Sequence, residues 1–259
     1  MKRTLIEPDL SLFPKKLHPL VISSDIYDSS CSERARVWLI DGERQYYLKR
    51  AGAGELEREC EMTECFYKHS LSVRVCEYFS DGEYDWLLTR AASGDDCVHQ
   101  KYLGEPERLC DKLAEALRRL HETDFSFCPA QSRTEEYLLL AEKNYRDGIF
   151  DPSHSSRFKT AEDAWEVARH GKELLCSDSL IHGDFCLPNI IIDDWKRVTY
   201  IDVDHSGVGD RHIDLYWCAW SLRYNLGTDR YRDRLFDAYG RDAIDTDVLD
   251  IIEAIETFG

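Results

Sequence analysis

Residues 180–194 read LIHGDFCLPNIIIDD, a stretch that places Asp184 and Asn189 inside an otherwise apolar segment. A buried strand or helix normally excludes such side chains, because burying a polar group without a hydrogen bond costs free energy. A second stretch of the same kind, VTYIDVDHSGVGDRHIDLYW at residues 198–217, contains Asp202. The two stretches therefore indicate that apolar segments build a rigid loop and hairpin, and that the polar side chains lie where this scaffold opens into a cleft.

The spacing of these polar residues favours a site for metal and proton transfer. NIII at 189–192 and VTYID at 198–202 are predicted to form a hairpin that turns at DDWKR, which would bring Asn189 and Asp202 to its open end. Amide and carboxylate oxygens are ligands that Mg²⁺ accepts, and a separate Asp184 could accept a proton from a hydroxyl.

Each of these residues also has a purely structural interpretation. Asp184 could cap a helix, Asn189 could serve a turn, and Asp202 could pair with Arg211 or His205. The combination with His182 and Gly183 at these spacings is what favours a functional site.

Length and composition are those of a globular protein without membrane spans. The chain has 259 residues, with 43% hydrophobic and 32% charged, which suits one large domain or two lobes that share a cleft. No apolar run approaches the roughly 18 residues of a membrane-spanning helix, and early Glu, Asp and Pro residues interrupt any signal-peptide segment. Ten cysteines are scattered singly, so we expect reduced thiols and a cytoplasmic location.

The net charge of −17 argues against nucleic acid or anionic membrane as the partner, because both require a basic surface. An acidic chain suits a cationic ligand. The alternative is that the acidic residues only keep the protein soluble.

The chain changes character near residue 94. Before it, five segments have strand patterns and predict an antiparallel meander with one helix at 54–70; these segments are LHPLVIS (17–23), ARVWLI (35–40), RQYYLKR (44–50), VRVCEYF (73–79) and DWLLTR (85–90). After it, a helix is expected to start at Pro106, and others near 133–146, 160–175, 211–225, 229–239 and 246–257. The predicted fold is α+β with two lobes, a small antiparallel-sheet lobe at 1–93 and a larger, mainly helical lobe at 94–259.

The pattern H-G-D-x-x-x-x-N at 182–189, followed by Ile201-Asp202 and GVGDRHID at 207–214, resembles the catalytic segment of the aminoglycoside phosphotransferases. The 3′-phosphotransferase branch, which has a protein-kinase-like fold, is the most similar. The resemblance implies that Asp184 is the catalytic residue facing the acceptor hydroxyl, and that Asn189 and Asp202 bind Mg²⁺. It also implies that His182, Asp210 and Asp214 support the loop.

By the same resemblance the first lobe holds ATP or GTP. Lys49 corresponds to the kinase strand lysine and Glu59 to its helix partner, with Glu64 as the substitute because the interval of ten residues is short. Ser30 and Ser32, in DSSCSERARVW, occupy the phosphate-covering loop, and Thr89, Arg90 and Ala92 form the adenine hinge. Taken alone, Lys49 could be a solvated lysine and the serine loop an ordinary turn.

The last eighteen residues contain six acids and no Lys or Arg. Val248, Ile252 and Ile255 are expected to bury one face of a final helix, and Asp250, Glu253 and Glu256 to form an acidic ridge beside it. A solvated helix face is the alternative.

In the resembling enzymes, terminal acidic and aromatic residues and the terminal carboxylate hold the antibiotic, which assigns Glu253, Glu256 and Gly259 to acceptor binding. Thr257 and Gly259 depart from that pattern, and His205 stands where an arginine is common. Asp151 is a further candidate beside the acceptor.

The resemblance thus implies a Mg²⁺-dependent enzyme that phosphorylates a hydroxyl of an aminoglycoside, at the 3′ position, and so confers antibiotic resistance. Two alternatives stay open. One is a kinase for choline, a macrolide, another aminocyclitol or a sugar. The other is a nucleotide-binding pseudokinase scaffold, which the intact set of Lys49, Asp184, Asn189 and Asp202 disfavours.

Overall fold

The computed structural model describes residues 3–31, 34–155 and 157–259. The chain forms two compact units, the first built from Met1–Asp96 and Ile190–Asp204, the second from Cys97–Asn189 and His205–Gly259. The predicted division at residues 93 and 94 assigned the hairpin after Asn189 to the second lobe. The structure groups that hairpin with the first unit instead.

An antiparallel sheet of six strands, in the order β1-β2-β3-β4-β6-β5, forms the centre of the first unit. The prediction of an antiparallel sheet is confirmed for the segments around residues 35–50 and 73–90. Strands β1 and β2 were not predicted and extend one edge of the sheet. The bounds are β1 Thr4–Ile6, β2 Asp25–Asp28, β3 Arg36–Asp41, β4 Gln45–Gly52, β5 Val75–Ser80 and β6 Tyr84–Arg90.

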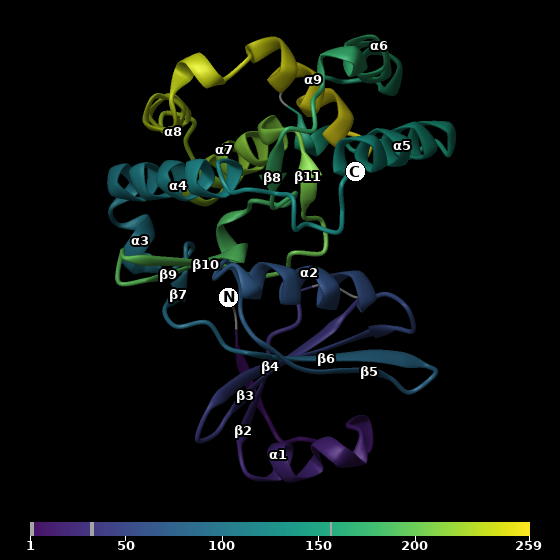
Figure 1. The fold of residues 1–259 in the computed structure, drawn as a ribbon, viewed down its shortest axis with the longest axis vertical. Coiled ribbons are helices and arrows are strands. Elements are labelled where there is room, and N and C mark those ends of the chain that lie inside the picture. Colours follow the sequence, from purple (N-terminus) through teal and green to yellow (C-terminus); the bar gives the residue numbers. More distant parts are fainter. Residues whose placement is uncertain (1–2, 32–33, 156) are drawn as a thin grey trace. The chain divides into compact units, whose positions relative to one another are not determined.

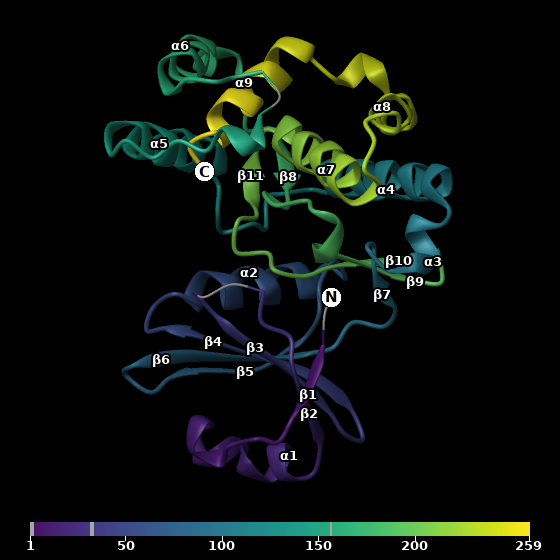
Figure 2. The ribbon, with the colours of Figure 1, turned by 180° about the vertical axis from the view of Figure 1, so that it is seen from behind.

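The predicted strand at 17–23 is wrong, because this segment is the helical turn η2, Lys15–Leu17, followed by helix α1, His18–Ile22. A proline lies in the first turn of α1, where its missing N–H leaves no bond unmade. Leu17 and Val21 are buried and pack with Phe13 against Trp38 and other residues of the sheet. This N-terminal segment therefore covers one face of the sheet, and α2 covers the other (Figures 1 and 2).

Helix α2, Glu57–Lys68, agrees with the predicted helix. Leu56, Cys60 and Thr63 are buried as expected, but Tyr67 at the end of the same predicted stripe is 47% exposed. The buried carboxylate of Asp85 accepts hydrogen bonds from the backbone N–H groups of Gly54 and Leu56, at 2.9 and 3.1 Å. Asp85 thereby fixes the start of α2 on the sheet.

The predicted hairpin is confirmed as β9, Ile190–Asp193, paired antiparallel with β10, Arg197–Tyr200. Asp194 and Trp195 in its turn have φ values of 45° and 63°, the left-handed region that tight hairpin turns require. The short strand β7, Asp95–Asp96, pairs with the other side of β9. Tyr200 exchanges hydrogen bonds with the segment before β5, from its N–H to Leu71 O at 2.9 Å and from Ser72 Oγ to its carbonyl at 2.7 Å.

The second unit is mainly helical, as predicted. Its core gathers apolar side chains from α5, α6, α7 and α9 around a two-stranded sheet of β8 and β11. The bounds are α3 Gln100–Leu103, α4 Pro106–His121, α5 Arg133–Arg146, η3 Pro152–His154, α6 Ala161–Gly171, η4 Lys172–Leu174, β8 Ser179–Ile181, η5 Leu187–Asn189, β11 Gly207–Gly209, α7 Arg211–Leu226, α8 Arg232–Tyr239, η6 Arg241–Ala243 and α9 Thr246–Glu256. The observed combination of an antiparallel sheet unit and a helical unit confirms the α+β class.

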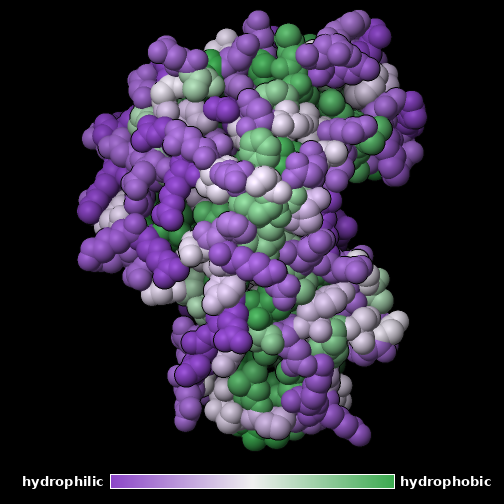
Figure 3. Space-filling model, viewed as in Figure 1, coloured by the Kyte–Doolittle hydropathy of each residue, from purple (hydrophilic) through white to green (hydrophobic). Residues whose placement is uncertain are grey.

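Hydrophilic residues predominate on the face shown in Figure 3, in keeping with a chain of which 32% is charged. Across the residues that the structure describes, every helix is too short or too polar to traverse a bilayer.

Candidate active site

Lys49 lies on β4 and points its ammonium at two carboxylates of the first unit. Its Nζ is 2.6 Å from Glu59 Oε2 on α2 and 2.7 Å from Asp202 Oδ1 after β10. Glu59 is 7% exposed, whereas Glu64, the substitute partner, is exposed on the same helix. The structure thus brings together three residues that are distant in the sequence, and it makes Glu59 the helix partner.

Burial alone would lower the pKa of Lys49, but the carboxylates of Asp202 and Glu59 raise it above its ordinary value. Burial raises the pKa of Glu59, and the Lys49 ammonium opposes that rise. One fixed positive charge therefore lies between two acids. Such a lysine is suited to exchange a carboxylate for a phosphate group.

Asp202 has a φ of 58°, a left-handed conformation that aspartate adopts more readily than most residues. The segment after it is held by α2, since Arg58 Nε donates a hydrogen bond to Asp204 O at 2.8 Å. Backbone strain of this kind is concentrated at functional sites. The side chain is 45% exposed, so one carboxylate oxygen can bind Lys49 while the group also meets solvent.

Asp184 and Asn189 face each other across the loop that ends in η5, in the second unit. Asn189 Nδ2 donates to Asp184 Oδ2 at 2.8 Å and to Asp184 O at 3.1 Å. These bonds fix the direction of the Asp184 carboxylate. They also leave the other polar atom of the Asn189 side chain, an oxygen, as the atom suited to a hard cation.

The backbone conformation and close packing at Gly183 explain why the H-G-D pattern contains a glycine. Its φ is +82°, and a Cβ at this position would lie 2.0 Å from the carbonyl oxygen of His205. Any other residue would therefore push the loop away from the segment after Asp202.

Buried Asp214, on the first turn of α7, anchors the same loop. Its carboxylate accepts hydrogen bonds from the backbone N–H groups of His182 and Gly183, both at 2.8 Å, and lies 3.2 Å from His121 Nε2. Asp210 caps α7 through the N–H of His212 at 2.9 Å. The loop that carries Asp184 is thus fixed to the N-terminal end of α7.

The structure describes part of the loop that is predicted to cover phosphate. Ser30 Oγ accepts a hydrogen bond from the Val37 N–H at 3.0 Å, and Asp28 Oδ1 accepts one from the Ser30 N–H at 2.9 Å. Ser32 lies outside the described residues. The turn at Ser30 is therefore built by hydrogen bonds within the loop rather than by glycines.

In the hinge, Thr89 is part of β6 and pairs with Tyr47 of β4. The Arg90 N–H donates to Arg74 O at 2.9 Å, and the Ala91 N–H donates to Gln45 O at 3.1 Å. Both N–H groups are therefore used by the sheet, and the hinge backbone from Arg90 to Ala92 stays a predicted edge for a base. Ala92 is the next residue along the hinge whose backbone can serve.

The predicted acidic ridge on α9 is wrong for Glu256, which is buried at 3% exposure. The Tyr137 hydroxyl donates a hydrogen bond to its carboxyl. Burial raises the pKa of Glu256 to about 8; hydrogen bonds from Tyr137 and Trp217 oppose the shift, and the nearby Asp184 carboxylate adds to it. Glu256 and Asp184 therefore share one electrostatic environment.

The other predicted acceptor residues also lie in the second unit. Glu253 Oε1 accepts from Ser155 Oγ at 2.8 Å, exposed Asp151 caps η3 through the Ser153 N–H, and Gly259 is exposed at the end of the chain. His205 Nδ1 lies 3.0 Å from Arg133 Nη2. An arginine thus lies beside the position where the resembling enzymes often carry one, but it comes from α5.

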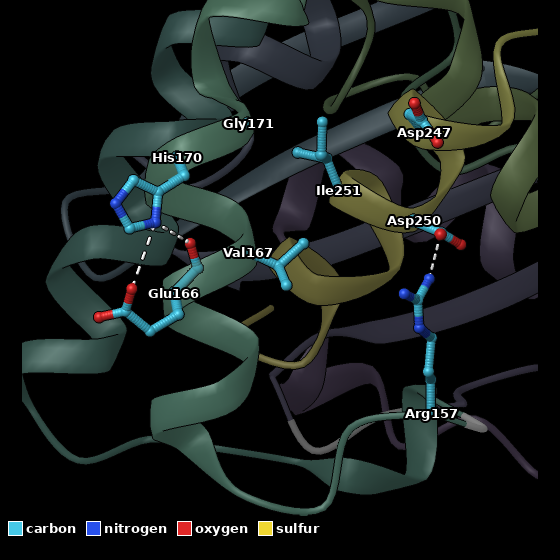
Figure 4. Close-up of a pocket in the computed structure, with 8 residues that line it drawn as sticks. All are labelled: Arg157, Glu166, Val167, His170, Gly171, Asp247, Asp250 and Ile251. Carbon is cyan, nitrogen blue, oxygen red and sulfur yellow. Dashed lines mark hydrogen bonds and ion pairs between the residues drawn. The ribbon is translucent and has the colours of Figure 1, made fainter.

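Figure 4 shows the outer side of α9, where Arg157 forms an ion pair with Asp250. These residues and His170 belong to the lining of a pocket between α6 and α9. Asp250 is therefore engaged away from Glu256, and the ridge does not act as one acidic surface.

Sequence reasoning missed Arg133, Tyr137, His154 and Trp217, all of which contact predicted site residues. His154 Nδ1 lies 3.1 Å from the Glu256 carbonyl oxygen. Only Trp217 had a detectable signal, because it is three residues after Asp214 on a predicted helix. The other three residues come from segments that have no fixed sequence interval to the motif, so the sequence alone could not identify them.

Among the described residues, no group of three or more His, Cys, Asp or Glu side chains forms a ready metal site. The oxygen donors of Asn189 and Asp202 nevertheless match the preference of Mg²⁺, which keeps several waters and binds through few protein ligands. The donor chemistry fits a magnesium ion that arrives with a phosphate ligand.

A sheet lysine held by a helix glutamate, with an H-G-D-x-x-x-x-N loop on a helical unit, defines the class of phosphotransferases with the protein-kinase-like fold. Residues 28–251 match the phosphotransferase enzyme family, and the chain belongs to that family.

Relatives with curated names agree with this assignment. The chain is 47% identical over 253 residues to a Lactococcus lactis protein named "Probable aminoglycoside 3'-phosphotransferase", covering 97% of both chains. It is 32% identical over 168 residues to the aminoglycoside 3'-phosphotransferase of Niallia circulans, covering 64% of each.

Solved structures confirm the predicted protein-kinase-like fold. Aminoglycoside phosphotransferase APH(3'')-Id from Streptomyces rimosus superposes with a TM-score of 0.79 at 21% identity, covering 97% of this chain and 99% of the other. An aminoglycoside-3'-phosphotransferase of type VIII gives a TM-score of 0.73 at 21% identity, covering 96% of both chains.

Proposed function

We propose that this protein transfers the γ-phosphoryl group of ATP or GTP to a hydroxyl of an aminoglycoside, at the 3′ position, and thereby confers antibiotic resistance. The observation that carries the proposal is the Lys49 ammonium held 2.6 Å from Glu59 and 2.7 Å from Asp202. The relative at 47% identity, named for this reaction, supports it. The structure of the Streptomyces rimosus enzyme with ADP and streptomycin, which matches with a TM-score of 0.78, supports the same chemistry.

The first unit would hold the nucleotide. Lys49 would leave Asp202 to bind the α- and β-phosphates and would stay oriented by Glu59. Ser30 and Ser32 would cover the phosphates, and the hinge from Thr89 through Arg90 to Ala92 would border the base. Asn189 and Asp202 would hold Mg²⁺, which neutralises phosphate charge when it is bound.

The second unit would hold and activate the acceptor. Asp184, oriented by Asn189, would accept the proton of the attacking hydroxyl as the phosphoryl group moves in line. Glu253, Asp151, His205 and Gly259 would border the acceptor. We place the reaction in the cytoplasm, where nucleoside triphosphates are present and the ten free cysteines stay reduced.

The experiment is nucleotide consumption by the purified protein with Mg²⁺, using pairs of aminoglycosides that differ only at the 3′-hydroxyl. We expect consumption with the 3′-hydroxylated member and none with its 3′-deoxy partner. Choline, a macrolide and a simple sugar serve as acceptor controls. Turnover with one of these alone would replace the acceptor class, and tight nucleotide binding without turnover for any acceptor would favour a scaffold.

A further inference from the structure

Helix α7 carries aromatic residues that the proposed chemistry does not use. Trp217, Trp220 and Tyr224 recur at spacings of three and four, so they lie on one stripe of the helix. The rings of Trp220 and Tyr224 are stacked, 5.2 Å apart and 9° from parallel, and Trp217 meets Trp220 edge-on at 5.5 Å. Tyr224 is 73% exposed, so one face of its ring covers Trp220 while the other faces solvent.

This aromatic stripe lies next to the stripe of α7 that holds the loop carrying Asp184. The adjacent stripe of α7 holds that loop at two points: Asp214 accepts from the Gly183 N–H at 2.8 Å, and Ser221 Oγ accepts from the Leu187 N–H at 3.0 Å. Trp217 follows Asp214 by three residues and Trp220 directly precedes Ser221, so the aromatic stripe is on the adjoining side of the helix.

Trp217, at the inner end of the stripe, donates a hydrogen bond to the buried carboxyl of Glu256. The ring of His154 stands edge-on against Trp217 at 5.5 Å and Trp220 at 5.9 Å, and its Nδ1 lies 3.1 Å from the Glu256 carbonyl. The aromatic rings therefore continue a polar region that already includes Glu256 and Asp184.

We propose that Tyr224, supported by Trp220, is a stacking platform for an amino-sugar ring of the acceptor, next to the ring that is phosphorylated. This inference rests on the proposed function and names residues that would set its specificity. An amino sugar presents an apolar C–H face and ammonium groups, and an aromatic ring face attracts both. Recognition by ring stacking would select acceptors by the shape and charge of a second ring rather than by hydroxyl pairing alone.

The test compares Tyr224→Ser with Tyr224→Phe in the full-length protein. Tyr224→Ser should raise the acceptor KM about tenfold and change kcat less than twofold, since a cation–π contact supplies affinity without touching the reacting atoms. Tyr224→Phe keeps the ring and should stay near wild type. Tyr67→Ser, at a tyrosine 47% exposed on α2, is the matched control and should change neither constant.

Equilibrium binding of kanamycin to Asp184→Asn, with and without Tyr224→Ser, separates the platform from the reaction. If the double variant binds kanamycin more weakly and the wild type shows no turnover, the stacking platform is supported and the proposed function is contradicted. Wild-type turnover with an unchanged KM and Kd in Tyr224→Ser would reject the platform alone. A dimer in sedimentation that dissociates in Tyr224→Ser would also overturn it, because the stripe would then be an interface between two copies.

Discussion

The position of Lys49 between two acids is the central feature at the residue scale. Removing its ammonium in Lys49→Ala leaves Glu59 and Asp202 without their shared cation, and removes the charge that would hold phosphate. We expect kcat/KM for the nucleotide to fall on the order of a hundredfold or more. Glu59→Gln should follow in the same direction, whereas Glu64→Gln on the exposed side of α2 should not. Equal effects of the two glutamate variants would contradict the pairing.

Alanine substitutions of Asp184 and Asp202 are expected to reduce turnover to different extents. Asp184→Ala removes the proposed proton acceptor and should lower kcat on the order of a hundredfold or more. Asp202→Ala removes a proposed Mg²⁺ ligand and should abolish turnover. Steady-state kinetics on folded protein, checked by circular dichroism, measures both, and exposed Asp229→Ala is the control. Near-wild-type turnover in Asp184→Ala would contradict the proposal that Asp184 is the general base.

Glu256 makes stability depend on pH. Its pKa rises from 4.5 to about 8 in the folded state, mainly through burial, so the folded protein binds a proton between these values that the unfolded chain has lost. The contribution to stability is complete below the unfolded pKa and is lost as pH rises toward the folded one. The groups around Glu256 are Tyr137, Trp217, Asp184 and Arg133.

The variant Glu256→Gln isolates this effect, because an amide keeps the bond to Tyr137 without titrating. We expect the free energy of unfolding in urea to decline less between about pH 5 and about pH 8 in the variant than in the wild type. Glu253→Gln, which alters a half-buried carboxylate of the same helix, is the control. Parallel pH profiles of wild type and Glu256→Gln would contradict the shift.

The candidate site residues within the H-G-D-x-x-x-x-N pattern could be named from the sequence, because the proposed chemistry restricts which residue types can occupy those positions. The burial of Glu256 was not, because helical periodicity places it beside Glu253 while the partner that covers it, Tyr137, comes from a distant helix. The use of the Arg90 N–H by the sheet was also hidden, since backbone bonds leave no trace in side-chain identity.

At the scale of elements, Gly183 shows how a loop depends on one backbone conformation. Gly183→Ala would combine a φ of +82° with a Cβ 2.0 Å from His205 O. Gly148→Ala has a comparable φ of +74° but nothing within 4 Å of its Cβ, so it isolates the conformational strain. We expect Gly148→Ala to cost about 1 kcal/mol in urea unfolding and Gly183→Ala more, with loss of activity only in the latter. Equal costs would show that the close approach is unimportant.

Elements with strong periodicity were predicted well, and short ones were not. Helix α4 buries a clear apolar stripe, and the β9–β10 hairpin has apolar strands joined by a polar turn. The prediction for segment 17–23 failed because a short segment rich in Leu, Val and Ile fits a buried strand and a buried helix equally well. Packing against Trp38 and the proline in the first turn stabilise the helical conformation of this segment.

For the whole molecule, the net charge of −17 predicts how ionic strength acts on the two substrates. A cationic acceptor is attracted by the field of the protein and an anionic nucleotide is not. Salt shortens the range of the electric field. Raising the ionic strength from about 0.02 to about 0.2 M should therefore increase the acceptor KM, whereas the nucleotide KM should stay unchanged or decrease. The same measurement with a neutral acceptor is the control, and parallel changes for both substrates would contradict the prediction.

The first unit is discontinuous in the sequence, because Ile190–Asp204 completes it after most of the second unit has been made. On the ribosome, the N-terminal sheet emerges without Asp202 and without the strand that pairs with β7. Domains generally fold as units in the order of synthesis, but here the first unit must wait for residue 204. A stalled or truncated chain that ends before this point would thus lack the acid that binds Lys49, so an incomplete translation product would be inactive however well its sheet had formed.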